Sequence, residues 1–167
     1  MLWAGKRPGG DQDPLGGSGG APMPGPGDAG ARLRCHHGAA LADGNLVQFG
    51  VMIERMTGKS ALQYNDYGCY CGLGGAHWPV DATDWCCHAH DCCYGRLEKL
   101  GCEPKFERYL FSTSKDDILC AGKTACQRQT CECDRRAALC FRRHLDTYSC
   151  KFAHYPNKLC VGPTPPC

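Results

Sequence analysis

The stretch DWCCHAHDCCYG, residues 84–95, decides the fold, because it holds four cysteines, two histidines and two aspartates in twelve residues. A metal cage, a redox site or a disulfide-pinned catalytic helix would each use such a cluster. Zinc sites favour CxxC pairs, whereas this chain has adjacent cysteines and CxC pairs and no CxxC pair. Adjacent side chains on a helix point in different directions and can bridge different neighbours. The cluster therefore favours disulfides, with a zinc protein as the alternative.

The composition of the whole chain points the same way. Sixteen of its 167 residues are cysteine, a density typical of disulfide scaffolds that mature in an oxidising compartment. The 19 basic and 17 acidic residues nearly balance, so a nucleic-acid partner is not expected. No apolar run is long enough to span a bilayer. We expect a secreted, extracellular protein.

Residues 1–44 differ in composition from the rest of the chain. They hold 12 of the 22 glycines and 5 of the 11 prolines, which predicts a disordered leader that buries too little apolar surface to fold. The leader lacks the charged-then-apolar pattern of a secretory signal peptide, although the cysteine content predicts export. We therefore expect one folded domain over residues 45–167 and hypothesise that the leader is an alternative start replacing a signal.

A short helix and a glycine-rich loop are predicted at the start of this domain. Leu46, Phe49, Ile53 and Met56 follow one another at spacings of 3, 4 and 3, which places one apolar stripe on a helix. The run YNDYGCYCGLGG, residues 64–75, is rich in glycine and predicts a loop with an unusual backbone path.

Two long helices and a small β-hairpin are expected next. The first helix should run from about residue 85 to about residue 101, with Thr83 or Asp84 as its cap. FERYLFS and DDILCA predict the hairpin over residues 106–121. The second helix is predicted over residues 124–145. The expected fold class is mainly α and disulfide-rich.

The cysteine spacing suggests how the two long helices are joined. Cys86 and Cys93 are seven residues apart, as are Cys133 and Cys140, and seven residues make two helical turns with both ends on one face. In antiparallel helices Cys93 would meet Cys133 and Cys86 would meet Cys140. Sequence alone does not fix the connectivity, but the matching intervals favour this clamp.

Such a clamp would hold His90 close to Asp134. A carboxylate on one imidazole nitrogen fixes the tautomer and stabilises the imidazolium, so the other nitrogen can take a proton from water. An isolated histidine is more often structural. The apposed Asp134 and the neighbouring Asp91 favour a catalytic role here.

Asp91 projects about 100° further round the helix than His90, toward the glycine-rich loop. Cys71 and Cys87 could tie that loop to the helix. Carbonyl oxygens of a flexible loop and a carboxylate are hard ligands that suit Ca²⁺. On spacing alone, a solvated helix position explains Asp91 equally well.

The motifs resemble those of the secreted phospholipase A2 family. YGCYCGLGG is similar to its calcium loop, DWCCHAHDCCY to its catalytic helix and CECDRRAALCF to the second helix of the same site. The resemblance covers residues 45–167. The ending GPTPPC and the placement of Cys92 and Cys167 resemble group II. The stretches NLVQFGVMIE, CYCGLGG and HYPNKLCVGPTPPC are most similar to group IIE. This implies the phospholipase A2 fold, with two long antiparallel helices, an N-terminal helix, a calcium loop and a small β-hairpin.

The resemblance implies Ca²⁺-dependent hydrolysis of the sn-2 ester of glycerophospholipids, which releases a fatty acid and a lysophospholipid. His90 would be the general base that activates water, and Asp134 would orient it. Tyr94 and Tyr109 would support this pair through hydrogen bonds. Non-catalytic receptor-binding or toxin-like proteins on the same scaffold lack the histidine or the calcium-binding aspartate, so the presence of both favours the enzyme.

The resemblance also implies ligand and substrate residues. The Ca²⁺ ligands would be the Asp91 carboxylate and the backbone carbonyls of Tyr70, Gly72 and Gly74. A weak second cation site is an alternative to an exposed turn at Asp66, beside Asn65. Lys105 would contact the lipid phosphate. The helix face with Leu46, Phe49 and Ile53 would line the acyl channel, with a plain core stripe as the alternative.

Seven disulfides are implied by the same resemblance: Cys69–Cys160, Cys71–Cys87, Cys86–Cys140, Cys92–Cys167, Cys93–Cys133, Cys102–Cys126 and Cys120–Cys131. Cys35 and Cys150 are left over. Cys150 would be a free thiol or a dimer link in an otherwise monomeric protein, and Cys35 receives no role.

The expected partner is the surface of a phospholipid membrane or a lipoprotein. Trp78, in the loop after the glycine-rich run, would lie at the bilayer interface or pack inside its loop. Four arginines of the second long helix form a local basic cluster: Arg135, Arg136, Arg142 and Arg143. A solvated helix face is the expected explanation of this cluster, with heparan sulfate or anionic lipid as the alternative. A receptor is a further alternative partner.

Overall fold

The computed structural model describes residues 45–72 and 74–167. The leader predicted over residues 1–44 lies outside the described residues. In the described part the fold has three α-helices, one two-stranded antiparallel sheet and short 3₁₀ turns. The predicted fold class, mainly α and rich in disulfides, is confirmed.

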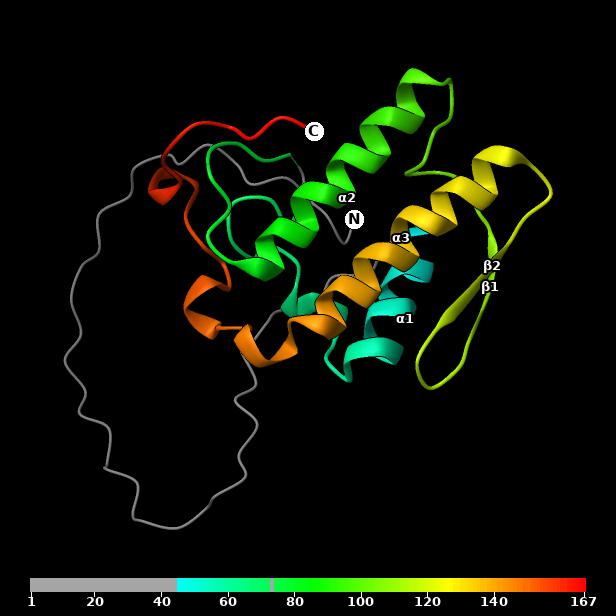
Figure 1. The fold of residues 1–167 in the computed structure, drawn as a ribbon, viewed down its shortest axis with the longest axis horizontal. Coiled ribbons are helices and arrows are strands. Elements are labelled where there is room, and N and C mark those ends of the chain that lie inside the picture. Colours follow the sequence, from blue (N-terminus) through cyan, green and yellow to red (C-terminus); the bar gives the residue numbers. More distant parts are fainter. Residues whose placement is uncertain (1–44, 73) are drawn as a thin grey trace, which may run out of the picture.

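Two long helices, α2 (Ala82–Lys99) and α3 (Ala125–Arg143), lie side by side in the centre of the molecule (Figure 1). Cys86 bridges to Cys140 and Cys93 bridges to Cys133. The earlier cysteine of α2 thus meets the later cysteine of α3, so the helices are antiparallel. The two disulfides that join the matched seven-residue intervals form the two ends of this clamp.

The start of α2 differs from the prediction. The N-cap is Asp81, whose side chain accepts a hydrogen bond from the backbone N–H of Asp84. The predicted caps, Thr83 and Asp84, instead lie inside the helix and are buried. Asp84 cannot serve as the cap because its carboxylate points away and binds backbone N–H groups of the glycine-rich loop.

Helix α3 begins with a capping box. Thr124 accepts a hydrogen bond from the backbone of Gln127, and the Gln127 side chain accepts one from the backbone of Thr124. This reciprocal pair satisfies two of the N–H groups that a helix start leaves unpaired. The helix ends two residues before the predicted end, and the 3₁₀ turn η2 (Leu145–Thr147) follows.

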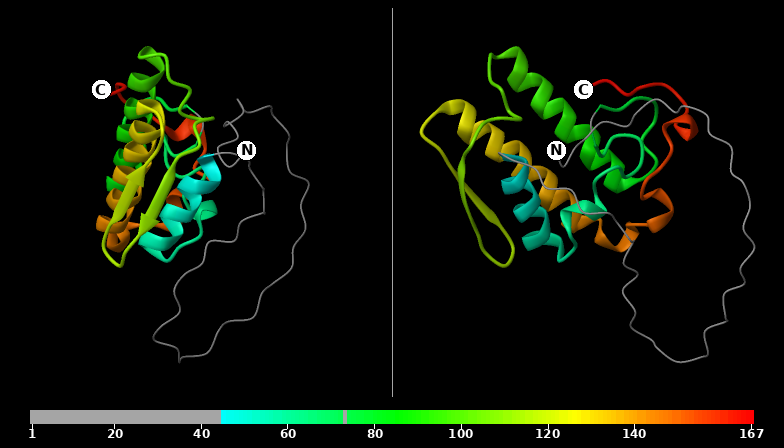
Figure 2. Two further views of the ribbon diagram at one scale, coloured as in Figure 1. Left: turned by 90° about the vertical axis from the view of Figure 1, so that its right-hand side faces the viewer. Right: turned by 180° about the vertical axis from the view of Figure 1, so that it is seen from behind.

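Helix α1 (Asn45–Thr57) packs against α3 (Figure 2). Its buried side chains include Phe49, Ile53 and Met56 of the predicted stripe and Met52 beside them. The aromatic core continues beneath the helix, where the rings of Tyr64 and Phe141 stack with centroids 4.3 Å apart. The predicted apolar stripe of α1 therefore faces the protein core.

The hairpin is shorter than predicted. Strands β1 (Leu110–Thr113) and β2 (Ile118–Ala121) pair antiparallel, with Leu110 opposite Ala121. The segment before β1 does not join the sheet, because Gln48 of α1 takes both backbone hydrogen bonds of Tyr109.

All seven disulfides implied by the resemblance are present in the structure. Cys150 is disulfide-bonded as well, so the free-thiol alternative for Cys150 is wrong.

Short 3₁₀ turns and an irregular tail complete the described chain. The turns are η1 (Ala61–Gln63), η3 (Cys150–Phe152) and η4 (Asn157–Leu159), besides η2. The tail returns to α2, where Cys92 bridges to Cys167 and Nε2 of His88 lies 3.0 Å from the carbonyl oxygen of Pro165 (Figure 1). Among the described helices, none has the length and apolar character needed to cross a bilayer.

Candidate active site

The centre of the site is a hydrogen bond between His90 of α2 and Asp134 of α3. Nε2 of His90 lies 2.7 Å from Oδ1 of Asp134, and both side chains are buried. Because a carboxylate oxygen accepts, the imidazole donates from Nε2. Nδ1 makes no hydrogen bond to any residue in the described part of the chain. The ring of Phe49 stacks on the imidazole with centroids 4.6 Å apart, which holds its plane.

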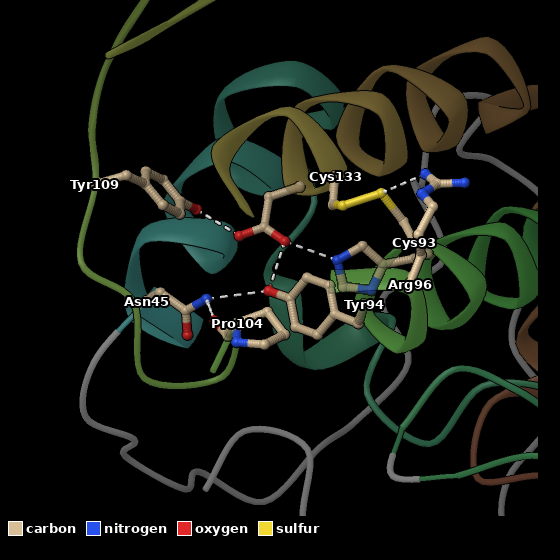
Figure 3. Close-up of polar contacts among 9 residues, drawn as sticks. Asn45, Cys93, Tyr94, Arg96, Pro104, Tyr109 and Cys133 are labelled. Carbon is tan, nitrogen blue, oxygen red and sulfur yellow. Dashed lines mark hydrogen bonds and ion pairs between the residues drawn. A yellow bond between two sulfur atoms is a disulfide. The ribbon is translucent and has the colours of Figure 1, made fainter. Parts of the chain in front are cut away.

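Asp134 accepts two more hydrogen bonds, from the tyrosines that the resemblance placed beside it. The hydroxyl of Tyr94 donates to Oδ1 at 2.7 Å, and that of Tyr109 donates to Oδ2 at 2.5 Å (Figure 3). Burial and the Asp134 charge raise the pKa of both hydroxyls far above the usual 10, so both remain protonated donors. Three donors thus compensate a carboxylate that has no solvent exposure.

Two polar residues of α1 that sequence reasoning missed hold these tyrosines. The amide nitrogen of Asn45 donates to the Tyr94 hydroxyl at 3.0 Å and to the carbonyl oxygen of Pro104 (Figure 3). Gln48 binds the backbone N–H and C=O of Tyr109. The signal in the sequence is a pair of amide side chains three residues apart on the first helix, beside the apolar stripe.

The glycine-rich loop is built around Asp84, which the sequence analysis predicted to be a helix cap. Its carboxylate accepts hydrogen bonds from the backbone N–H groups of Cys69, Tyr70 and Val80, at 2.8, 2.8 and 2.9 Å. Burial raises the pKa of Asp84, and the three N–H groups oppose that rise. Gly68 has a φ of +58°, and a Cβ there would lie 2.4 Å from Cγ of Asp84. Only glycine allows the loop to approach this carboxylate.

The predicted calcium ligands fit a hard cation. The Cys71–Cys87 bridge fastens the loop to α2 one turn before Asp91. Burial raises the pKa of the Asp91 carboxyl to about 7, whereas the charges of His90 and Lys105 lower it. A cation beside this carboxylate would offset the cost of removing it from water.

The loop also offers free oxygen atoms. The backbone carbonyls of Tyr70, Gly72 and Gly74 accept no hydrogen bond from any residue that the structure describes. Gly72 and Gly74 have φ angles of 139° and 72°, a conformation that favours glycine. Carbonyl oxygens that accept no hydrogen bond within the described residues, together with the Asp91 carboxylate, are the kind of oxygen donors that Ca²⁺ prefers.

The other predicted positions lie as follows. Phe49 and Ile53 are buried and Leu46 is partly buried. Lys105 is exposed, and its charge acts on Asp91. The Asp66 carboxylate lies 3.6 Å from Nδ1 of His154.

The structure adds detail to two surface predictions. Arg135 pairs with Asp117 at 2.7 Å, and Arg142 pairs with Asp116, so half of the predicted basic cluster is neutralised by the hairpin turn. Trp78 is 51% exposed and packs edge-on against Trp85 with ring centroids 5.2 Å apart.

The zinc alternative is wrong for the described part of the chain. The two His/Cys groups there that could hold a metal are Cys86–Cys140 with His144 and Cys92–Cys167 with His88. Both contain a disulfide, and bridged sulfur atoms are not thiolate ligands. No described cysteine is free.

Comparison with known proteins agrees with this geometry. The family model "Phospholipase A2" matches residues 46–153. Group IIE secretory phospholipase A2 of Mus musculus is 82% identical over 76% of this chain and 89% of its own length, and that of Homo sapiens is 82% identical over 77% and 90%. The membrane-associated phospholipase A2 of Homo sapiens is 54% identical over 78% and 91%. This chain belongs to the phospholipase A2 family of enzymes.

Proposed function

We propose that this chain hydrolyses the sn-2 ester of glycerophospholipids in a Ca²⁺-dependent reaction and releases a fatty acid and a lysophospholipid. The observation that carries the proposal is the 2.7 Å contact between Nε2 of His90 and Oδ1 of Asp134. It leaves Nδ1 as the one basic nitrogen of a buried imidazole, beside the Asp91 carboxylate. Family membership supports the substrate class.

His90 is the general base of the proposed reaction. Nδ1 takes a proton from water, and the resulting hydroxide attacks the ester carbonyl carbon. The N–H on Nε2 stays on Asp134, which fixes the tautomer and stabilises the imidazolium. When the tetrahedral intermediate collapses, Nδ1 returns the proton to the departing glycerol oxygen. His90 is thereby restored and the atoms balance.

The residues that would hold Ca²⁺ are Asp91 and the carbonyls of Tyr70, Gly72 and Gly74. A bound Ca²⁺ supplies positive charge where the ester oxygen becomes negative. Asp84 keeps the loop close to α2, because it binds the N–H groups of Cys69 and Tyr70. Asp66, with its neighbour Asn65, is retained as a weak second cation site.

The acyl chain would enter along α1, past the Phe49 ring that lies on His90. Val47 and Val51 are 44% and 37% exposed on the same helix, which gives α1 an outer apolar surface for a membrane or lipoprotein. Lys105 would contact the lipid phosphate. A secreted location is supported by the secretory relatives and by the disulfides.

The test is hydrolysis of phospholipid vesicles by the full chain, with Ca²⁺ or with a calcium chelator. The chelator should abolish hydrolysis, and His90→Gln should lower it about 10³-fold, the scale of a general base. His144→Gln, at the end of α3, is the matched control and should retain activity. Activity that survives both the chelator and His90→Gln would refute the mechanism. Saturable binding to a receptor without any hydrolysis would favour the non-catalytic alternative.

A further inference from the structure

The C-terminal tail, residues 160–167, is fastened at both of its ends by disulfides. Cys160 bridges to Cys69 in the glycine-rich loop, and Cys167 bridges to Cys92 in α2. Between these two bridges the tail forms neither helix nor strand as it returns to α2 (Figure 1). Its course is therefore set by its own hydrogen bonds, which show what the tail holds.

The middle of the tail binds the two residues that follow the glycine-rich loop. The Trp78 N–H donates to the Val161 carbonyl at 3.0 Å, and the His77 N–H donates to Oγ1 of Thr164 at 2.9 Å. Nδ1 of His77 lies 3.0 Å from the carbonyl oxygen of Gly162, and it donates because a carbonyl can only accept. His77 has a φ of +72°, a conformation that residues other than glycine seldom adopt. The tail thus holds His77 in this conformation through both its backbone and its ring.

Thr164 also closes a ring of three hydrogen bonds with Tyr70, a proposed calcium ligand. The Tyr70 hydroxyl donates to the His77 carbonyl oxygen at 2.6 Å and is hydrogen-bonded to the Thr164 side chain. Burial raises the pKa of the Tyr70 hydroxyl, whereas the bond with Thr164 lowers it, so Thr164 is the donor in that bond. The His77 N–H in turn donates to Thr164. Each hydroxyl therefore donates one bond and accepts one, which gives all three bonds a single direction.

The Tyr70 side chain is also in contact with the rest of the loop. Tyr70 is buried, and its N–H donates to Oδ1 of Asp84 at 2.8 Å. A Cβ on Gly75 would lie 2.4 Å from Cδ1 of Tyr70, so the chain at Gly75 lies directly against the tyrosine ring. The proposed ligands Gly72 and Gly74 lie between these two residues in the sequence. A displaced Tyr70 ring would therefore shift the other loop carbonyls as well as its own.

We propose that the C-terminal tail sets the Ca²⁺ affinity of the glycine-rich loop and that Thr164 is the positioning residue through which it acts. Thr164 orients the Tyr70 side chain, and the bond from His77 to Gly162 keeps the tail in place. The loop is thereby ordered before the ion arrives, so less freedom is lost on binding. This inference rests on the proposed function, because it concerns the ligand set assigned there to Ca²⁺.

Thr164→Val keeps the shape of this side chain and removes its hydroxyl. It should weaken Ca²⁺ binding about 3–5-fold, the scale of one hydrogen bond, in isothermal titration calorimetry of the full chain with the metal alone. Thr164→Ser restores the hydroxyl and should bring the affinity back to within about two-fold of the unsubstituted chain. Thr147→Val is the matched control, because the Thr147 hydroxyl is exposed and donates to the His144 carbonyl after α3. It should leave the calcium affinity unchanged.

A double-mutant cycle tests whether Thr164 acts through Tyr70. Tyr70→Phe removes the hydroxyl and keeps the backbone carbonyl that would bind the ion. Thr164→Val should then have little further effect on calcium affinity in the Tyr70→Phe background. Thermal unfolding in the presence of a chelator measures a purely structural role of the tail. A lower melting temperature with unchanged calcium affinity, or equal losses of affinity in both backgrounds, would overturn the proposal.

The outcomes remain distinguishable from failure of the proposed function. An unsubstituted chain that binds no Ca²⁺ would refute the calcium dependence proposed above, and the role of the tail with it. An unsubstituted chain that binds Ca²⁺ no more tightly than Thr164→Val would refute only the role of the tail. Thr164 is exposed, so Thr164→Val should fold. Loss of folding in this variant would make Thr164 structural and overturn the inference.

Discussion

Nε2 of His90 and Oδ1 of Asp134 lie 2.7 Å apart although 44 residues separate them along the chain. His90 lies between Cys86 and Cys93, and Asp134 lies next to Cys133. The bridges Cys86–Cys140 and Cys93–Cys133 therefore enclose the pair from both sides. The geometry of the pair is held by covalent bonds as well as by packing.

Removal of the Cys93–Cys133 bridge should loosen this pair. Replacing both cysteines by alanine should cost about 2–4 kcal/mol of unfolding free energy and also lower kcat, because α2 and α3 can separate beside His90. The matched control removes Cys102–Cys126, which joins the chain just after α2 to the first turn of α3. It should lower stability with a smaller effect on kcat. Thermal unfolding and vesicle hydrolysis measure the two effects, and equal kcat losses would contradict the prediction.

Asp134→Asn should be more damaging than loss of either tyrosine hydroxyl. The amide is nearly isosteric, but it does not stabilise the imidazolium and allows the wrong tautomer, so kcat should fall about 10³–10⁴-fold. Tyr109→Phe removes one of three donors and should cost about 2–13-fold. The comparison requires kcat at saturating substrate. A similar loss in both variants would show that Asp134 acts mainly through its hydrogen-bond count.

Asp91→Asn should weaken Ca²⁺ binding about 100-fold or more, because it removes the one carboxylate of the proposed ligand set. Isothermal titration calorimetry with the metal alone measures this without reference to hydrolysis. Asp66→Asn should leave the stronger binding step unchanged and affect only a weak second step. Unchanged calcium affinity in Asp91→Asn would exclude this carboxylate as a ligand.

The ion pair between Asp117 and Arg135 should make stability depend on pH in the acid range. The Ile118 N–H and the Arg135 guanidinium lower the pKa of Asp117 below its usual 3.8. A lowered folded-state pKa stabilises the protein above the unfolded pKa, and this stabilisation is lost as pH falls through the folded value. Asp117→Asn should therefore be less stable at neutral pH and match the unsubstituted chain near about pH 2. Urea unfolding at both pH values measures the difference, and a constant difference would contradict it.

The disulfide motifs carry most of the fold. The equal cysteine intervals predicted the antiparallel α2–α3 clamp and brought His90 to Asp134. The cap of α2 was mispredicted because Asp84 serves the loop instead, a tertiary role that local sequence does not reveal. Asn45 escaped notice for a related reason. Its partner Tyr94 lies 49 residues away, and helical periodicity describes one helix at a time.

The cross-links have a consequence for the fate of the chain under attack by proteases. The exposed turn of the hairpin, residues 114–117, is a natural place for a protease to cut. Of the seven bridges between described cysteines, five join the chain before this turn to the chain after it. A nicked molecule would migrate as one piece in non-reducing electrophoresis and keep His90 and Asp134 on covalently joined fragments.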